Sequence, residues 1–165
     1  MCPLCWTRID DRLIHGQVTT VWRRYLDYEA IVIIDDLVAA DPMLVDVLHL
    51  AAPVDTPLTI YTTEKAVAAL QVEPQPRTLL LLKAPQTALA LIQKGLDIAQ
   101  INVGNIAAAP GKKRAFQSIS LGPDEVTALN ALAEQGVAIT FQATPEDTTV
   151  RWQTLKARFA RRSIK

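Results

Sequence analysis

The sequence predicts an α/β fold, an open, mostly parallel twisted sheet with helices on both faces and one antiparallel strand near an edge. Two observations support this fold class. Apolar, β-rich runs alternate along the whole chain with segments of helical periodicity. Several runs are apolar at consecutive positions, as at residues 31–34 and 79–82, which is typical of strands in a parallel sheet covered on both faces.

Strands and helices are expected to alternate from one end of the chain to the other. The expected strands are residues 4–9, 30–34, 58–61, 78–82, 98–103 and 137–142. The expected helices are residues 17–25, 42–51, 64–70, 85–94, 123–135 and 148–160. Capping signals mark several ends, since Asp41 precedes Pro42 at a helix start and Gly95 and Gly136 follow helix ends.

The segment 104–121 interrupts this alternation. Pro110-Gly111 indicates a turn, and residues 114–120 are the candidate for the short antiparallel strand near an edge of the sheet. The chain contains no internal repeat, no low-complexity tract and no long linker. Residues 1–165 are therefore expected to form a single domain.

The charge balance excludes partners that are attracted by a large net charge. The 165 residues include 17 Lys and Arg and 17 Asp and Glu. A neutral chain has no overall field to attract nucleic acid or an anionic membrane, so a protein partner or a small anion is favoured. No apolar run approaches the ~18 residues that span a bilayer. The first six residues lack a basic leader, so a cytoplasmic location is expected.

Cys2 and Cys5 form a Cys-x-x-Cys pair, which is compatible with a redox motif or half of a zinc site. The pair stands at the chain start, whereas the redox motif follows a strand and opens a helix. The only histidines, His15 and His49, lie at unsuitable spacings for a zinc site. Ordinary thiols are therefore favoured, His49 is interpreted as a packed or surface helix residue, and no metal is expected.

Chemistry-bearing residues concentrate in the segment 8–18, which joins the first expected strand to the first expected helix. Loops in this position border the ligand crevice of open α/β sheets. His15 suits a phosphoryl acceptor, because the unperturbed imidazole pKa of about 6.5 leaves much of the ring neutral near pH 7. Asp10, Asp11 or a loop carbonyl is expected to hold the other ring nitrogen.

Donors for an incoming phosphate are present in the same segment. Arg8 and Arg12 offer planar, forked contacts to a dianion. The backbone amides of Gly16 and Gln17 point at an anion if the helix begins there. The competing interpretation is a solvated, internally paired turn in which His15 only caps a helix or lies on the surface.

Three other clusters are interpreted as structural. Asp35-Asp36 resembles the start of a Mg²⁺-dependent phosphoacceptor, but the expected strand 58–61 has no following aspartate and residues 103–105 supply no lysine. Turn residues are the favoured interpretation. Lys112-Lys113-Arg114 is interpreted as a solvated turn, with partner docking near His15 as the alternative. The basic residues of the C-terminal tail indicate a solvated helix end.

The run from Arg8 to Val18, RIDDRLIHGQV, resembles the active-site signature of the enzyme IIB components of the mannose/fructose/sorbose class of the bacterial sugar phosphotransferase system. Residues 35–42, 101–106 and 136–145 are similar to later segments of the same family. The resemblance therefore spans almost the whole chain, and its first motif is highly specific.

The resemblance implies that His15 receives a phosphoryl group from an enzyme IIA domain. It implies that the group then passes to a sugar bound by a membrane permease of IIC and IID components, which would hold the protein at the inner membrane. Arg12 is the first choice for neutralising the phosphate, Arg8 is the second, and Asp10 is expected to organise the loop. The residues matching the motif also include Gly16 and Gln17.

No cofactor is required by such chemistry, because the donor already holds an activated P–N bond. Within the same fold, the alternative is a regulatory phosphohistidine protein that acts on a protein partner without a sugar permease. The sequence leaves the sugar and the oligomeric state open, and a homo-oligomer is compatible with it.

Overall fold

The computed structural model describes residues 5–72 and 76–163. Within these residues, the strands of the main sheet are β1 (Cys5–Asp10), β2 (Ala30–Ile34), β3 (Leu58–Tyr61), β4 (Thr78–Leu82), β5 (Gln100–Asn105), β8 (Ala138–Phe141) and β9 (Val150–Arg151). Their order across the sheet is β3-β2-β4-β1-β5-β8-β9. All pairs are parallel except β8 with β9. The predicted mostly parallel sheet is thereby confirmed.

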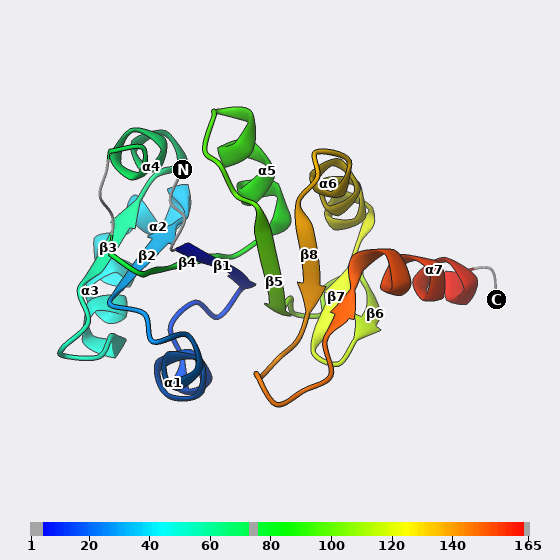
Figure 1. Cartoon of the computed structure of the whole chain (residues 1–165), viewed down its shortest axis with the longest axis horizontal. Helices are drawn as coiled ribbons and strands as arrows, with labels where there is room; N and C mark the ends of the chain where they lie inside the picture. Colours follow the sequence, from blue (N-terminus) through cyan, green and yellow to red (C-terminus); the bar gives the residue numbers. More distant parts are fainter. Residues whose placement is uncertain (1–4, 73–75, 164–165) are drawn as a thin grey trace.

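Helices cover both faces of this sheet (Figure 1). One face is covered by α4 (Thr63–Leu70), α5 (Pro85–Gln93), α6 (Pro123–Glu134) and the C-terminal helix α7 (Trp152–Ser163). The other face is covered by η1 (Gln17–Trp22), α1 (Arg23–Leu26), α2 (Asp36–Ala39) and α3 (Pro42–Ala51). Among the described residues, none of these helices has the length and hydropathy needed to cross a bilayer.

Two buried cores, one on each face, explain why the strands are apolar at consecutive positions. Ile31 and Ile33 pack into the core beneath η1, α2 and α3, whereas Val32 and Ile34 pack into the larger core beneath α4, α5 and α6. Successive side chains of a strand point to opposite faces, so a strand buried on both faces needs apolar residues at every position.

The antiparallel edge strand lies elsewhere than expected. Residues 113–121 form a separate hairpin of β6 (Lys113–Phe116) and β7 (Ile119–Leu121), with Gln117 in a left-handed conformation at the turn. Instead, β9 pairs antiparallel with β8 at the edge of the main sheet. The terminal helix therefore begins at Trp152 and not at residue 148, because residues 150 and 151 are taken up by this pairing.

Several local boundaries also differ from the expectations. The first helical segment starts as a wider π-helical turn, η1, before it continues as α1. The short helix α2 was not expected. Its N-cap is Asp35, whose carboxylate accepts from the amide of Val38, while Asp36 accepts from the amide of Thr63. Asp35-Asp36 thus serves as a pair of structural acceptors. Cys5 opens β1, and Cys2 lies outside the described residues.

Candidate active site

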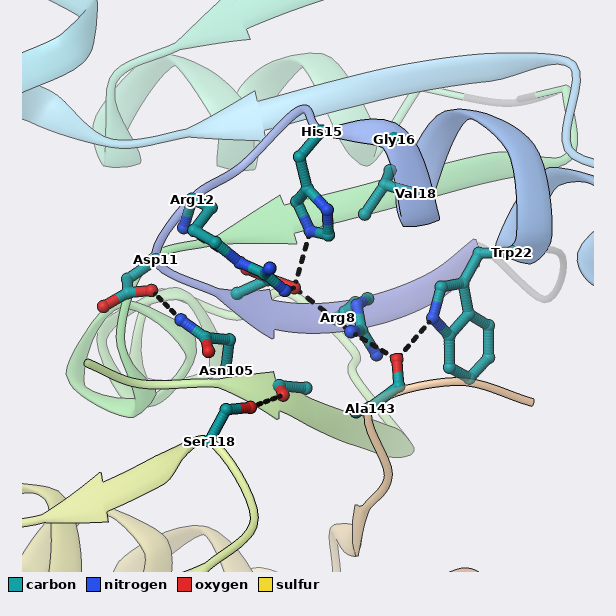
Figure 2. Close-up of polar contacts among 12 residues, drawn as sticks. Arg8, Asp11, Arg12, His15, Gly16, Val18, Trp22, Asn105, Ser118 and Ala143 are labelled. Carbon is teal, nitrogen blue, oxygen red and sulfur yellow. Dashed lines mark hydrogen bonds and ion pairs between the residues drawn. The ribbon is translucent and has the colours of Figure 1, made fainter. Parts of the chain in front are cut away.

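The candidate site is built from the end of β1 and the turn that follows it (Figure 2). Asp10, expected in the loop, is the last residue of β1, and the turn brings Arg12 and His15 back over it. The turn is tight, because Leu13 is in a left-handed conformation (φ 57°) and its amide donates to the carbonyl of Asp10 at 2.9 Å. Leu13 and Ile14 are buried beneath the turn, which fixes His15 above the sheet.

The imidazole of His15 is bound through one nitrogen only among the contacts of the described residues. Nε2 lies 2.9 Å from Oδ2 of Asp10, and the side chain keeps 17% of its surface exposed. Because an ionised carboxylate only accepts hydrogen bonds, Nε2 carries the proton and donates it to Asp10. The lone pair of the neutral ring is then on Nδ1. This geometry gives the free nitrogen of His15 the character of a nucleophile.

Asp10 is the centre of the site. Its fully buried carboxylate accepts hydrogen bonds from the side chains of Arg8, Arg12 and His15 and from the amide of Arg12. Burial alone would raise the pKa of Asp10. The hydrogen bonds from His15 and Arg12 and the charge of Arg8 outweigh burial and lower this pKa to about 2. Asp10 is therefore an anion throughout the physiological pH range, and its hydrogen bonds connect β1 to Arg12 and His15 of the turn.

Arg8 does not reach the surface. Its side chain is 0% exposed, and its two terminal nitrogens donate to four acceptors within the protein. These acceptors are the side chains of Asn102 and Asp10 and the carbonyls of Gln142 and Ala143. The expectation that Arg8 contacts an incoming phosphate does not fit this environment. The geometry makes Arg8 a support for Asp10, because both terminal nitrogens already donate to acceptors of the protein and Nε, which has no partner among the described residues, is buried away from solvent.

The space around Arg8 is shaped by Trp22 and Gly104. The guanidinium lies 4.7 Å from the centroid of the Trp22 ring, whose Nε1 donates to the carbonyl of Ala143. On the opposite side, β5 bulges, since Ile9 pairs with Val103 but Asp10 pairs with Asn105. The unpaired residue is Gly104, and a Cβ there would lie 1.8 Å from Nη2 of Arg8. The bulge and the glycine together make room for the guanidinium.

Arg12 is the guanidinium of this turn that solvent reaches. Its side chain is 45% exposed, while Nε and Nη2 donate to Asp10 at 3.1 and 3.2 Å. This arrangement holds a positive charge beside the imidazole of His15 without burying it. Arg12 is thus in a position to pair with an anion next to the ring.

Gly16 and Gln17 lie at the start of the helical segment, next to His15. Helical hydrogen bonding begins with the amide of Thr19, which donates to the carbonyl of His15 at 3.1 Å. The amides of residues 16–18 precede this first bond, and such amides have no acceptor in a preceding turn. The sequence predicted that the amides of Gly16 and Gln17 bind the anion, and the structure has both residues at the start of the helical segment, directly after His15 in the chain.

A neighbouring carboxylate ties the turn to the end of β5. Asp11 accepts from the side-chain amide of Asn105 and, at 2.7 Å, from the backbone amide of Ala107. Asp11 thereby contributes to the shape of the turn, whereas the ring of His15 is held by Asp10. Among the described residues, no group of three or more His, Cys, Asp or Glu side chains is arranged to hold a metal ion.

Sequence reasoning did not assign roles to Asn102, Gly104 or Trp22. A signal was present for the first two, since both lie at the end of the expected strand 98–103 and parallel strands end at one edge of the sheet. No signal pointed to Trp22, because its contact with Arg8 depends on how the helix packs over β1.

Comparisons with known proteins identify the family of this chain. The family model described as "PTS system sorbose subfamily IIB component" matches residues 4–163. The sorbose-specific EIIB component of Klebsiella pneumoniae is 37% identical over 146 residues, covering 87% of this chain and 88% of that protein. The crystal structure of the IIBSor domain of the sorbose permease from Klebsiella pneumoniae has a TM-score of 0.84 at 34% identity, covering 93% of this chain and 95% of that one.

A third relative joins two components in one polypeptide. The mannose-specific EIIAB component of Escherichia coli (strain K12) is 28% identical over 151 residues, which are 90% of this chain and 46% of that protein. The family match over nearly the full length and the relative at 37% identity lead to one conclusion. The chain belongs to the sorbose subfamily of the IIB components of the sugar phosphotransferase system.

Proposed function

We propose that this protein carries its phosphoryl group on Nδ1 of His15, receiving it from enzyme IIA and passing it to a sugar during uptake. The observation that carries the proposal is the 2.9 Å contact between Nε2 of His15 and Oδ2 of Asp10. This contact reserves Nε2 for a hydrogen bond and leaves Nδ1 to react.

In the acceptance step, the Nδ1 lone pair of His15 attacks the phosphorus of the donor's phosphohistidine. The donor's P–N bond breaks, its electron pair returns to the donor imidazole, and a P–N bond forms on Nδ1. The ring of His15 then carries both a phosphoryl group and the Nε2 proton, so it gains positive charge. The anionic Asp10 stabilises this charge as a carboxylate stabilises an imidazolium.

The phosphate itself is held by groups around the ring. Arg12 supplies a half-exposed guanidinium, and the amides of residues 16–18, including Gly16 and Gln17, supply donors at the start of the helical segment. Catalysis of this kind consists mainly of positioning and charge stabilisation. Arg8 contributes indirectly, because it holds Asp10 from below.

IIB components of this system work with an enzyme IIA donor and a IIC/IID permease, and they transfer the phosphoryl group to a sugar. We place the protein at the inner membrane through docking on that permease. The relatives named above are components for sorbose and mannose, which favours a role in transport over a regulatory phosphohistidine protein without a permease.

The test uses a phosphorylated cognate IIA domain and protein labelled with ¹⁵N at its histidines. We expect one phosphoryl group on the wild type, none on His15→Ala, and a ³¹P–¹⁵N coupling to Nδ1. A phosphoryl group on Nε2, or on the His15→Ala variant, would refute the assignment. Membranes containing the permease should then discharge the adduct only when its sugar is present.

A further inference from the structure

The helices α2 and α3 lie on the same side of the sheet as the His15 turn (Figure 1), and they carry an exposed apolar surface. We call it the α2–α3 surface. It consists of Leu37 on α2 and of Met43, Leu44, Val47 and Leu50 on α3, all large and exposed. Leu37, Met43 and Leu50 are each more than three-quarters exposed. Met43, Val47 and Leu50 are spaced by four and three residues, so they form one stripe along the helix.

This surface is connected to the site through a shared core. Leu13 and Ile14, which precede His15, pack in the same buried cluster as Val38 of α2 and Leu48 of α3. The helix α2 follows the carboxyl end of β2 directly, and β2 is parallel to β4, which is parallel to β1. The α2–α3 surface therefore begins at the same edge of the sheet as His15.

The segment that carries this surface is acidic, although the whole chain is neutral. Residues 25–64 contain no Lys or Arg and eight acidic residues, Asp27, Glu29, Asp35, Asp36, Asp41, Asp46, Asp55 and Glu64. Three of them, Asp27, Glu29 and Asp55, pair with arginines outside the segment. Within the described residues, the acids on and beside α2 and α3 form no ion pair.

The charge argues against two occupants of the α2–α3 surface. A second copy would bring the same acidic rim against itself, and like charges brought together at an interface are unfavourable. The cytoplasmic leaflet of a membrane carries anionic lipids and would repel this face in the same way. The surface suits a partner with an apolar centre and a basic rim that arrives from solution.

We infer that the α2–α3 surface is the docking site for the enzyme IIA donor, and we expect basic residues around the apolar centre of the donor's matching surface. The choice of partner rests on the proposed function, since a donor that transfers its phosphoryl group directly must cover the protein around His15. The relative that joins A and B components in one chain is consistent with a direct pairing of these two parts. Exposed apolar side chains grouped beside a site are typical of such interfaces.

The test measures binding of unphosphorylated IIA by calorimetry, so it does not depend on the chemistry of His15. We expect the triple variant Met43→Ser/Val47→Ser/Leu50→Ser to raise the Kd at least about tenfold. The matched control is Val72→Ser, a 65% exposed apolar residue just after α4, on the other face of the sheet. Its Kd should stay within twofold of the wild-type value.

A second pair of variants tests the acidic rim. Asp46→Lys on α3 should weaken IIA binding more at low salt than at high salt, while the exposed Asp97→Lys, distant from this surface, should not. The inference would be overturned if the triple variant bound IIA with a Kd within twofold of the wild-type value. It would also be overturned if the wild type formed a dimer and the triple variant were a monomer. Normal phosphorylation of the triple variant by phosphoramidate, a small donor that needs no docking, separates lost docking from lost chemistry.

Discussion

The guanidinium of Arg8 occupies the place where a side chain at residue 104 would begin. A Cβ on Gly104 would lie 1.8 Å from Nη2 and 2.0 Å from Cζ of Arg8. Arg8 is held there by buried acceptors, so it has no room to withdraw. Gly104 thus acts on the imidazole through two intervening residues, because Arg8 positions Asp10 and Asp10 positions His15.

Gly104→Ala should therefore destabilise the fold and disturb the site together. We expect a loss of about 2–4 kcal/mol in the free energy of unfolding, since the extra methyl collides with a buried, hydrogen-bonded group. Urea denaturation measures this change. Gly16→Ala is the matched control for stability, because nothing lies within 4 Å of its added Cβ and its φ is −50°. Equal stability of the two variants would contradict the role of Gly104.

Asp10→Asn tests the orientation of the imidazole. An asparagine can present its NH₂ group to Nε2, which favours the ring tautomer with the proton on Nδ1 and removes the nucleophile. We expect single-turnover phosphorylation by phosphorylated IIA to slow at least about a hundredfold.

The neighbouring carboxylate provides the control for this prediction. Asp11→Asn removes a charge next to Asp10, but Asp11 binds Asn105 and Ala107, away from the ring of His15. Its phosphorylation rate should stay within a few-fold of the wild-type rate. If both variants were slowed equally, the general charge of the turn and not the bond to Nε2 would explain the effect.

Substitutions of the two arginines should differ in their effects, one on the rate of phosphoryl transfer and the other on the free energy of unfolding. Arg12→Gln removes a half-exposed group, so we expect less than about 1 kcal/mol of lost stability but a phosphoryl transfer at least tenfold slower. Arg8→Gln leaves Asp10 without its buried partner and should cost about 3 kcal/mol of stability. Urea denaturation and single-turnover kinetics on both variants check the pair. A stable Arg8→Gln variant would show that Arg8 is not the support described above.

The sequence was sufficient for the fold class because parallel strands buried on both faces leave an unmistakable apolar pattern, as in β2 and β4. It was sufficient for the place of His15, because the loop after the first strand borders the crevice. It misplaced the antiparallel edge strand, since the two-residue pairing of β9 has no periodicity to detect. The burial of Arg8 could not be predicted, because a cation in a strand reveals its burial only through partners distant in the sequence, such as Ala143.

Acid should weaken the fold in a way that depends on Asp10. Its pKa is lowered from an ordinary 3.8 to about 2, so the unfolded state binds the proton more tightly than the folded state. The stabilisation is fully present above the ordinary value and is lost as the pH falls through about 2. The shift corresponds to about 2 kcal/mol of unfolding free energy, lost mainly between about pH 5 and pH 2.

Urea denaturation of the wild type and of Asp10→Asn across this pH range isolates the contribution. The wild type should lose the additional ~2 kcal/mol on acidification, because its carboxylate must be protonated inside a shell of donors from Arg8, Arg12 and His15. Asp10→Asn starts from a lower stability at pH 7 and should show a correspondingly smaller dependence on pH, since it has no proton to take up there. Parallel curves for the two proteins would mean that Asp10 keeps an ordinary pKa and that the bond to His15 is weaker than its 2.9 Å length indicates.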